Sequence, residues 1–278
     1  FESILGIKSL LIGRKQVTMY EELLEFAVRM AREAGKIHLA YFRSDKLAIR
    51  TKSNVYDVVT RADKESEELI AGMIAERYPD HAVLGEEGGS RGSAESDWRW
   101  VVDPLDGTTN YSQGLPVFAV SIALQHKDET VVGVVYAPYL NELFTAVKGG
   151  GAFLQYASRE PERIRVGEKQ ALATSVIATG FPYDKDVNPD NNSDNVARII
   201  PYVRDVRRLG SAAYDISCVA AGLLDGYWEL ALHEWDVCAA ELILREAGGV
   251  VCDLRRDRGI SIVAGNAGIV EEMRKYVR

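Results

Sequence analysis

Residues 100–109 read WVVDPLDGTT, an apolar run followed directly by two aspartates three positions apart. The apolar run predicts a buried strand, and Pro104 fixes the turn that follows it. Two carboxylates at the end of a buried strand repel each other, and a cation between them removes this cost. Asp103, Asp106 and the carbonyl of Leu105 offer the hard oxygen ligands that Mg²⁺ prefers. The stretch therefore predicts a metal site, and a turn closed by capping carboxylates is the simpler alternative.

Gly107, Thr108 and Thr109 follow the second aspartate and point to phosphate binding. Glycine allows the backbone to approach a ligand closely. Backbone N–H groups at the start of a helix or turn hold anions such as phosphate. We therefore expect these three residues to open a helix or turn beside the metal site.

Three further acidic segments are candidates for the same site. Glu86 and its neighbour Glu87 follow an apolar run and precede two glycines, although most such pairs belong to solvated loops. Asp236 precedes an apolar helix and Asp63 lies near the start of another, so helix capping is the alternative role for both. Each signal is modest alone. Together, and in this order along the chain, they are specific.

The composition is that of a folded globular protein, with 278 residues of which 47% are hydrophobic and 27% charged. The net charge of −8 argues against a non-specific binder of nucleic acid or of anionic membranes. Three cysteines without CxxC spacing and four histidines without HExxH spacing argue against a disulfide framework and a zinc hydrolase. We expect a cytoplasmic protein that binds neither membrane nor nucleic acid.

Apolar periodicity predicts alternating helices and strands, which is typical of a mixed α/β (α+β) fold. We expect helices over residues 20–35, 62–78, 195–203, 211–223, 235–247 and 270–277. We expect strands over residues 82–84, 100–102, 117–124, 130–137, 142–147, 175–179, 226–232, 250–253 and 262–264. A soft boundary near residue 155 separates an N-terminal α+β subdomain, 19–155, which carries most candidate metal ligands, from a C-terminal α/β subdomain, 156–278. We expect residues 1–18 to be a leader or an artificial extension, with an amphipathic packing arm as the alternative.

Five segments in this order resemble the inositol monophosphatase family of magnesium-dependent, lithium-sensitive phosphatases, and look closest to its bacterial members. The segments are KSNVYDVVTRAD at 52–63, GEE at 85–87, WVVDPLDGTTNY at 100–111, RRLGSAAYDISCVAAG at 207–222 and WDVCAAELILREAGGVVCD at 235–253. The resemblance runs from about residue 19 to the C-terminus. It implies a five-layered αβαβα sugar-phosphatase fold and a homodimer.

The resemblance also implies roles for individual residues. A first Mg²⁺ would be held by Glu86, Asp103 and the Leu105 carbonyl, and a second by Asp103, Asp106 and Asp236, while Glu86 would approach a third ion. Asp63 with Thr108 would orient or deprotonate the attacking water, and Glu86 would join them as a catalytic residue. The substrate would be bound by Gly107, Thr108, Thr109, Gly210, Ser211, Ala212, Glu229 and Asp236. Lys52 and Asp57 would support the site.

These roles predict hydrolysis of a small phosphate monoester by metal-activated water, without a phosphoenzyme. Inositol 1-phosphate or a similar polyol or sugar phosphate is the first expectation, because Glu229 can accept hydrogen bonds from ring hydroxyls. Fructose 1,6-bisphosphate, histidinol phosphate and 3′-phosphoadenosine 5′-phosphate remain alternatives on the same fold. A regulatory protein that docks on transcription machinery through Arg204, Arg207 and Arg208 is an alternative of another class.

Overall fold

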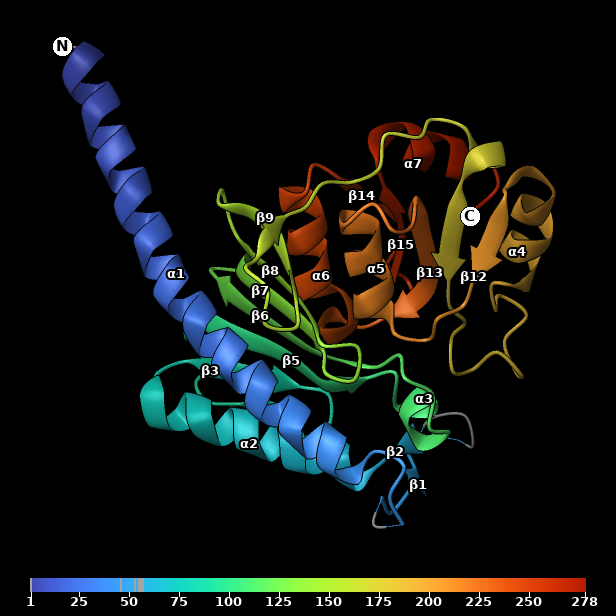
Figure 1. Cartoon of the computed structure of the whole chain (residues 1–278), viewed down its shortest axis with the longest axis horizontal. Helices are drawn as coiled ribbons and strands as arrows, with labels where there is room; N and C mark the ends of the chain where they lie inside the picture. The colour runs from blue at the N-terminus through green and yellow to red at the C-terminus, as the bar shows by residue number, and fades with distance from the viewer. Residues whose placement is uncertain (1, 46, 53, 55–57) are drawn as a thin grey trace.

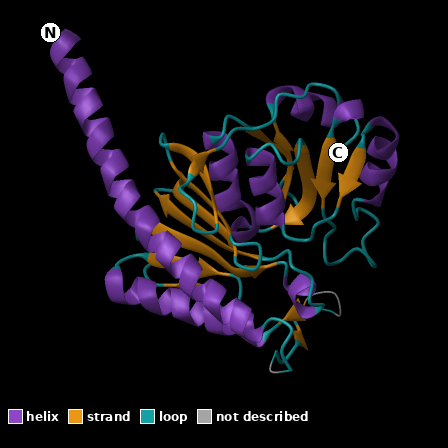
Figure 2. Cartoon of the chain, viewed as in Figure 1, coloured by secondary structure: helices purple, strands orange, loops and turns teal. Residues whose placement is uncertain are grey.

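The computed structural model describes residues 2–45, 47–52, 54 and 58–278, with side chains from Met19 onward. The predicted supporting residue Asp57 lies outside the described residues. Figure 1 and Figure 2 show two β-sheets with helices between them and on both outer faces. Within the described part of the chain, no helix is both long and apolar enough to cross a membrane.

The larger sheet has eight strands in the order β10-β9-β8-β7-β6-β5-β3-β4. The strands are β3 (Ala82–Gly85), β4 (Gly89–Arg91), β5 (Trp98–Asp106), β6 (Ala119–His126), β7 (Glu129–Ala137), β8 (Glu142–Val147), β9 (Gly151–Tyr156) and β10 (Glu162–Arg163). Only β3 and β5 are parallel neighbours in this sheet. Its central strands β6 and β7 are mostly apolar and buried, because helices cover both faces of the sheet.

The smaller sheet has five strands in the order β12-β11-β13-β15-β14. The strands are β11 (Val176–Thr179), β12 (Asp205–Arg207), β13 (Gly226–Leu232), β14 (Val250–Arg255) and β15 (Ile260–Gly265). Strand β11 runs parallel to both of its neighbours, and the remaining pairs are antiparallel. A separate two-stranded ribbon joins β1 (Arg50–Thr51) to β2 (Val58–Val59).

The helices form three layers around these sheets (Figure 1). Helices α1 (Glu2–Tyr41) and α2 (Arg61–Arg77) pack on the outer face of the larger sheet. Helices α5 (Ala212–Ala220) and α6 (Glu234–Glu246) lie between the sheets. The outer face of the smaller sheet carries α4 (Ser193–Ile199), α7 (Ala267–Met273) and the 3-10 turns Leu172–Thr174 and Ile200–Tyr202. The predicted mixed α/β, five-layered αβαβα fold is confirmed.

The end predicted for the first helix, near Gly35, is wrong. Helix α1 continues to Tyr41, and a Cβ atom on Gly35 would lie 2.6 Å from Cε1 of Tyr136. The glycine therefore permits close packing of the helix against the sheet and does not end it. At the other end, the backbone of residues 2–18 continues α1, and this half projects away from the rest of the molecule in Figure 1.

Other predicted boundaries are corrected by local chemistry. The helix expected over 211–223 ends at Ala220, followed by Gly222 with a φ of 70°. The helix expected over 195–203 is divided into α4 and a 3-10 turn that contains Pro201. Sequence periodicity missed the short strands β1, β2, β4, β10 and β12 and also the longer strand β9. The division near residue 155 stays a prediction; it falls within β9, and both β9 and the following β10 belong to the larger sheet.

Candidate active site

Strand β5 carries Asp103 and Asp106 into the space between the two sheets. Its pairing with β6 shifts register between these two residues, which bends the end of the strand. The backbone N–H of Leu105 donates to Oδ1 of Asp103 over 2.9 Å and closes the predicted turn. Asp103 is 2% exposed and Asp106 is 8% exposed, so both carboxylates are buried.

Gly107 turns the chain from β5 into a short helix, α3 (Thr108–Ser112). Its φ is 93°, and a Cβ atom here would lie 3.1 Å from the carbonyl oxygens of Gly210 and Val117. Only glycine fits both the conformation and the space without strain. The prediction that residues 107–109 open a helix is confirmed, and the turn lies against the segment that begins α5.

Asp106 connects the larger sheet to the start of α5. Its Oδ2 accepts hydrogen bonds from Oγ of Ser211 at 2.7 Å and from the N–H of Ala213 at 2.7 Å. Its Oδ1 accepts one from the N–H of Ala212 at 3.2 Å. Burial and then the charge of Asp236 raise the pKa of Asp106 to about 6, against the lowering by these bonds.

Glu86 lies on the loop after β3, where Lys52 neutralises it. Nζ of Lys52 lies 2.7 Å from Oε1 of Glu86 and also pairs with Glu87. Burial raises the pKa of Glu86 to about 7, the charge of Lys52 opposes this shift, and Asp236 adds to it. The predicted proximity of Lys52 to the site is confirmed by these contacts.

The first turn of α2 presents Asp63 to the site. Oδ2 of Asp63 accepts hydrogen bonds from the N–H of Thr60 at 2.8 Å and from its hydroxyl at 2.5 Å. Oδ1 lies 2.9 Å from Oγ1 of Thr108, which also lies 2.9 Å from the Leu105 carbonyl oxygen. Burial raises the pKa of Asp63 to about 6. Asp63 and Thr108, which were predicted to act together, are thus in contact, and Thr108 also contacts the Leu105 carbonyl, a predicted metal ligand.

The first turn of α6 presents Asp236. The alternative that Asp236 is the N-cap residue is wrong, because His233 occupies that position. The N–H of His233 donates to Oδ2 of Asp236 over 2.6 Å. Burial and then the charges of Glu86, Asp106 and Asp236 raise the pKa of Asp103 well above its ordinary value. The four acidic residues predicted to hold metal therefore come from three segments, namely the loop after β3, the end of β5 and the first turn of α6, and their charges act on one another.

A pocket between α3, β13, α5 and α6 brings the predicted substrate residues together. It is lined by Asp106, Gly107, Thr108, Thr109, Gly210, Ser211, Ala212, Glu229 and Asp236. Burial raises the pKa of Glu229 to about 7, and the Tyr227 hydroxyl donates a hydrogen bond to its carboxylate. A larger cleft beside α6, lined among others by Arg99 and Arg245, contains none of the predicted site residues.

The donor set suits Mg²⁺ in its chemistry. Buried carboxylates that repel one another, beside a backbone carbonyl, are what a hard divalent cation would stabilise. Among the described residues, however, no three carboxylate, imidazole or thiol groups are arranged to hold a metal ion. Glu86 pairs with Lys52, Asp106 with α5, and Asp236 with the N–H of His233. Ligation would use the carboxylate lone pairs that these contacts leave free, or would require the side chains to turn toward the ion.

The structure adds residues that sequence reasoning missed. Glu67 accepts hydrogen bonds from the N–H groups of Glu87 at 2.7 Å and Gly88 at 2.6 Å, and so fixes the loop that carries Glu86. Its position four residues after Asp63, on the same helix face, was an available signal. The pocket is also lined by Arg208, Asp215 and the segment 179–183, whose approach depends on the tertiary fold.

Comparisons with known proteins agree with this site. A sequence model described as the inositol monophosphatase family matches residues 19–276. The chain is 47% identical to the Nus factor SuhB of Pasteurella multocida over 232 residues, which cover 83% of this chain and 85% of the relative. It is 40% identical to the Nus factor SuhB of Escherichia coli K12 over 260 residues, which cover 92% and 96%.

Solved structures give the same result. The extragenic suppressor protein suhB from Bartonella henselae superposes with a TM-score of 0.81 at 35% identity, covering 92% of this chain and 98% of that one. An inositol monophosphatase from Anabaena superposes with a TM-score of 0.81 at 36% identity, covering 92% and 95%. The chain therefore belongs to the inositol monophosphatase family.

Proposed function

We propose that the protein is a magnesium-dependent phosphate monoesterase that releases inorganic phosphate from inositol 1-phosphate or a similar small polyol or sugar phosphate. The observation that carries the proposal is the meeting of Glu86, Asp103, Asp106 and Asp236 beside the turn that begins at Gly107. Carboxylates suit the metal, and the backbone of that turn suits the phosphate.

The metal ligands would be the residues named from the family resemblance. Glu86, Asp103 and the Leu105 carbonyl would hold one Mg²⁺; Asp103, Asp106 and Asp236 would hold a second; Glu86 would approach a third. When bound, the ions supply Lewis acidity toward the phosphoryl oxygens and a water of lowered pKa. Lys52 pairs with Oε1 of Glu86 in the structure, which leaves Oε2 of that carboxylate for an ion.

Asp63 and Thr108 would prepare the attacking water. Thr60 binds Oδ2 of Asp63 through two donors, and Oδ1 remains for the Thr108 hydroxyl. When Thr108 donates its single proton to Asp63, its oxygen can accept a hydrogen bond from water. The pKa of Asp63, raised to about 6 by burial, lies close to neutral pH and suits a proton acceptor.

The alcohol side of the pocket supports a polyol leaving group. Glu229 borders the pocket, and its carboxylate packs closely against Gly180: a Cβ atom on Gly180 would lie only 2.0 Å from Oε1 of Glu229. Its oxygens would accept hydrogen bonds from sugar or polyol hydroxyls. Phosphate binding would fall to residues 107–109, and residues 210–212 would border the alcohol.

A substrate panel tests the proposal. Phosphate release would be measured for inositol 1-phosphate, fructose 1,6-bisphosphate, histidinol phosphate and 3′-phosphoadenosine 5′-phosphate, with and without Mg²⁺. We expect release to require Mg²⁺, to be inhibited by millimolar Li⁺, and to have the highest kcat/KM for inositol 1-phosphate. Absence of Mg²⁺-dependent release from every ester would overturn the proposal. We also propose that the protein is cytoplasmic and forms a homodimer. Sedimentation of the purified protein would test the dimer.

A second candidate function is docking on transcription machinery, as the name Nus factor of the relatives suggests. Arg204 and Arg207 are exposed at β12, an edge strand of the smaller sheet, and could meet an acidic partner. Arg207 pairs locally with Asp205, and Arg208 lines the pocket instead. Replacing Arg204 and Arg207 with alanine would abolish binding to RNA polymerase and leave hydrolysis unchanged if this function holds.

A further inference from the structure

The wall of the pocket opposite Gly107 is an irregular segment. Residues 180–192 run from β11 to α4 as turns and extended chain, and Phe181, Pro182 and Tyr183 line the pocket together with Asp106 and Asp236. Such a segment lacks the ladder of bonds that fixes a strand or helix. Side chains that reach it from other elements therefore contribute to its position.

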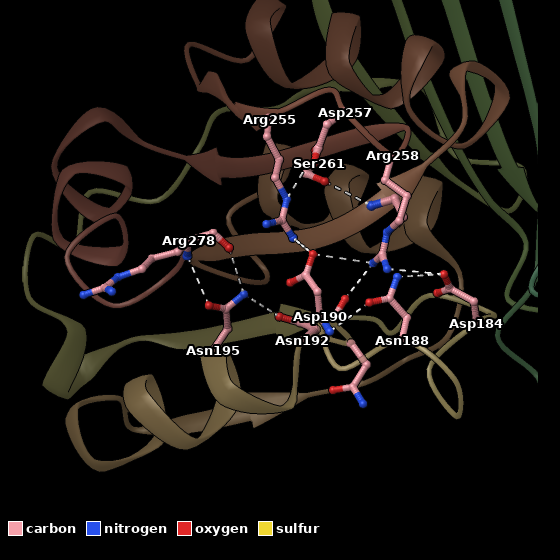
Figure 3. A network of polar contacts seen from close by, with 12 residues as sticks. Asp184, Asn188, Asp190, Asn192, Asn195, Arg255, Asp257, Arg258, Ser261 and Arg278 are labelled. Carbon is pink, nitrogen blue, oxygen red and sulfur yellow. Dashed lines mark hydrogen bonds and ion pairs between the residues drawn. The ribbon is translucent and has the colours of Figure 1, made fainter.

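Two arginines of the β14–β15 hairpin reach this segment. Nη2 of Arg258 donates to the carbonyl of Asp190 at 2.6 Å, and Nη1 lies 3.2 Å from Oδ2 of Asp184. Arg255 pairs with the carboxylate of Asp190. Figure 3 shows both arginine side chains pointing from the hairpin toward Asp184 and Asp190. One guanidinium thus connects the two ends of the turn that follows Tyr183.

The turn has its own internal hydrogen bonds, so contacts at Asp184 and Asp190 position the turn as a whole. Nδ2 of Asn188 donates to Oδ2 of Asp184 at 3.1 Å, and the N–H of Asp190 donates to Oδ1 of Asn188 at 3.0 Å. On the side facing the N-terminal half, Nδ2 of Asn54 donates to the carbonyl of Tyr183 at 3.3 Å. The pocket wall is therefore held from both sides.

The hairpin is itself fixed to the strand that borders the pocket. Gly259 has a φ of 96°, and a Cβ atom there would lie 2.8 Å from the carbonyl oxygen of Leu232. This close approach sets the position of the neighbouring Arg258 relative to β13. Leu232 lines the same pocket. The arginine therefore transmits the position of β13 to the segment on the other side of the cavity.

We propose that Arg258, supported by Arg255, is a positioning residue that holds the pocket wall at Phe181–Tyr183 and so sets the affinity for the phosphate ester. The effect on affinity rests on the proposed function, whereas the effect on the segment does not. Arg258 does not line the pocket, so its loss would weaken substrate binding through the wall and leave the chemical step intact.

The test compares Arg258→Met with Arg256→Met in the full chain. Arg256 is on the same hairpin but pairs with Asp253, three residues away, so its variant removes an arginine without touching the wall. We expect Arg258→Met to raise KM about two- to fivefold, the range that a partly exposed ion-pair network supplies, with kcat unchanged. It should also speed hydrogen exchange at residues 181–192. Arg258→Lys should recover part of the KM, since lysine keeps the charge but not the forked contact.

The outcomes separate the two proposals. Equal KM values for the two methionine variants, or a fall in kcat without a change in KM, would overturn the positioning role. Absence of Mg²⁺-dependent hydrolysis by the wild type would refute the proposed function alone. Hydrogen exchange would then decide the positioning role, supported by faster exchange at 181–192 in Arg258→Met only and overturned by unchanged exchange. Circular dichroism would verify that each variant is folded.

Discussion

The first turns of α2 and α6 are built alike and face different surroundings. In each, an aspartate at the third helical position accepts a hydrogen bond from the backbone N–H three residues earlier: Asp63 from Thr60 and Asp236 from His233. Asp63 is fully buried, and its second oxygen contacts Thr108. Asp236 borders the open pocket. One local motif thus supplies a buried group suited to proton transfer and an accessible group suited to a cation.

The largest effect is expected at Asp236. Asp236→Asn keeps an oxygen that can accept the His233 N–H and removes the negative charge offered to metal. We expect kcat/KM to fall about a thousandfold or more, with an increased Mg²⁺ requirement, because metal contacts contribute several kcal/mol to such transition states. Asp106→Asn should behave in the same way. Full Mg²⁺-dependent turnover by either folded variant would contradict the proposed metal roles.

Asp63→Asn should cause a smaller loss with a different signature. Loss of a general base lowers kcat by about a hundredfold or more. The Mg²⁺ concentration for half-maximal rate should stay unchanged, and the limb of the pH profile near pH 6 should disappear, as the raised pKa of Asp63 predicts. If Asp63→Asn and Asp236→Asn show the same Mg²⁺ dependence, the contrast between the first turns of α2 and α6 is wrong.

The stability of the metal-free protein should fall as the pH rises from about 4 to about 7. Burial raises the pKa of Glu86 to about 7 and that of Asp106 to about 6, so the folded state retains protons that the unfolded state has released. The free energy of unfolding should drop by on the order of 3 kcal/mol across this window. Thermal melts at pH 5 and 8 would measure it. Mg²⁺ should raise the melting temperature more at pH 8 than at pH 5. Equal increases at the two pH values would contradict the proposal that the acidic cluster binds a cation.

The smallest expected effects are on the stability of variants at the two N-cap residues, Thr60 and His233. Thr60→Ala removes the hydroxyl that binds both Asp63 and the N–H of Ala62, and should lower the free energy of unfolding by about 1 kcal/mol. His233→Ala keeps the backbone N–H that binds Asp236. It loses the stacking on Trp235 and the exposed imidazole whose Nδ1 lies 3.5 Å from Oδ2 of Asp236, so we expect a smaller change, of about 0.5 kcal/mol. Urea titrations would compare the variants, and a larger loss for His233→Ala would reverse the assignment.

Local sequence patterns predicted the alternating helices and strands and the acidic segments, whereas the five layers were predicted from the family resemblance. The apolar run before Asp103 made β5 recognisable, and the glycine after Asp106 predicted the turn into α3. The cap of α6 was misplaced because histidine is not among the preferred N-cap residues, so Asp236 seemed the natural cap. A glycine also suggested a helix end at Gly35, where the aromatic ring of Tyr136 requires close packing instead.

Other features depend on contacts between distant segments and left no pattern in the sequence. Arg258 and Asp184 are 74 positions apart, and each is of a residue type that is common on protein surfaces. The same holds for the bonds from Asp106 to α5, more than 100 positions away, which only the stacking of the two sheets brings together. Sequence reasoning can propose which residues form such a site, but not which distant residues form hydrogen bonds with them.

The packing of α6 against β7 has a consequence for substrate entry. A Cβ atom on Gly133 would lie 2.5 Å from the carbonyl oxygen of Ala239, so the backbones of strand and helix are in near contact. With no side chain between them, this contact favours movement of α6, which carries Asp236, together with the sheet that carries Asp103. We therefore expect the two parts of the acidic cluster to keep their relative positions when a substrate enters.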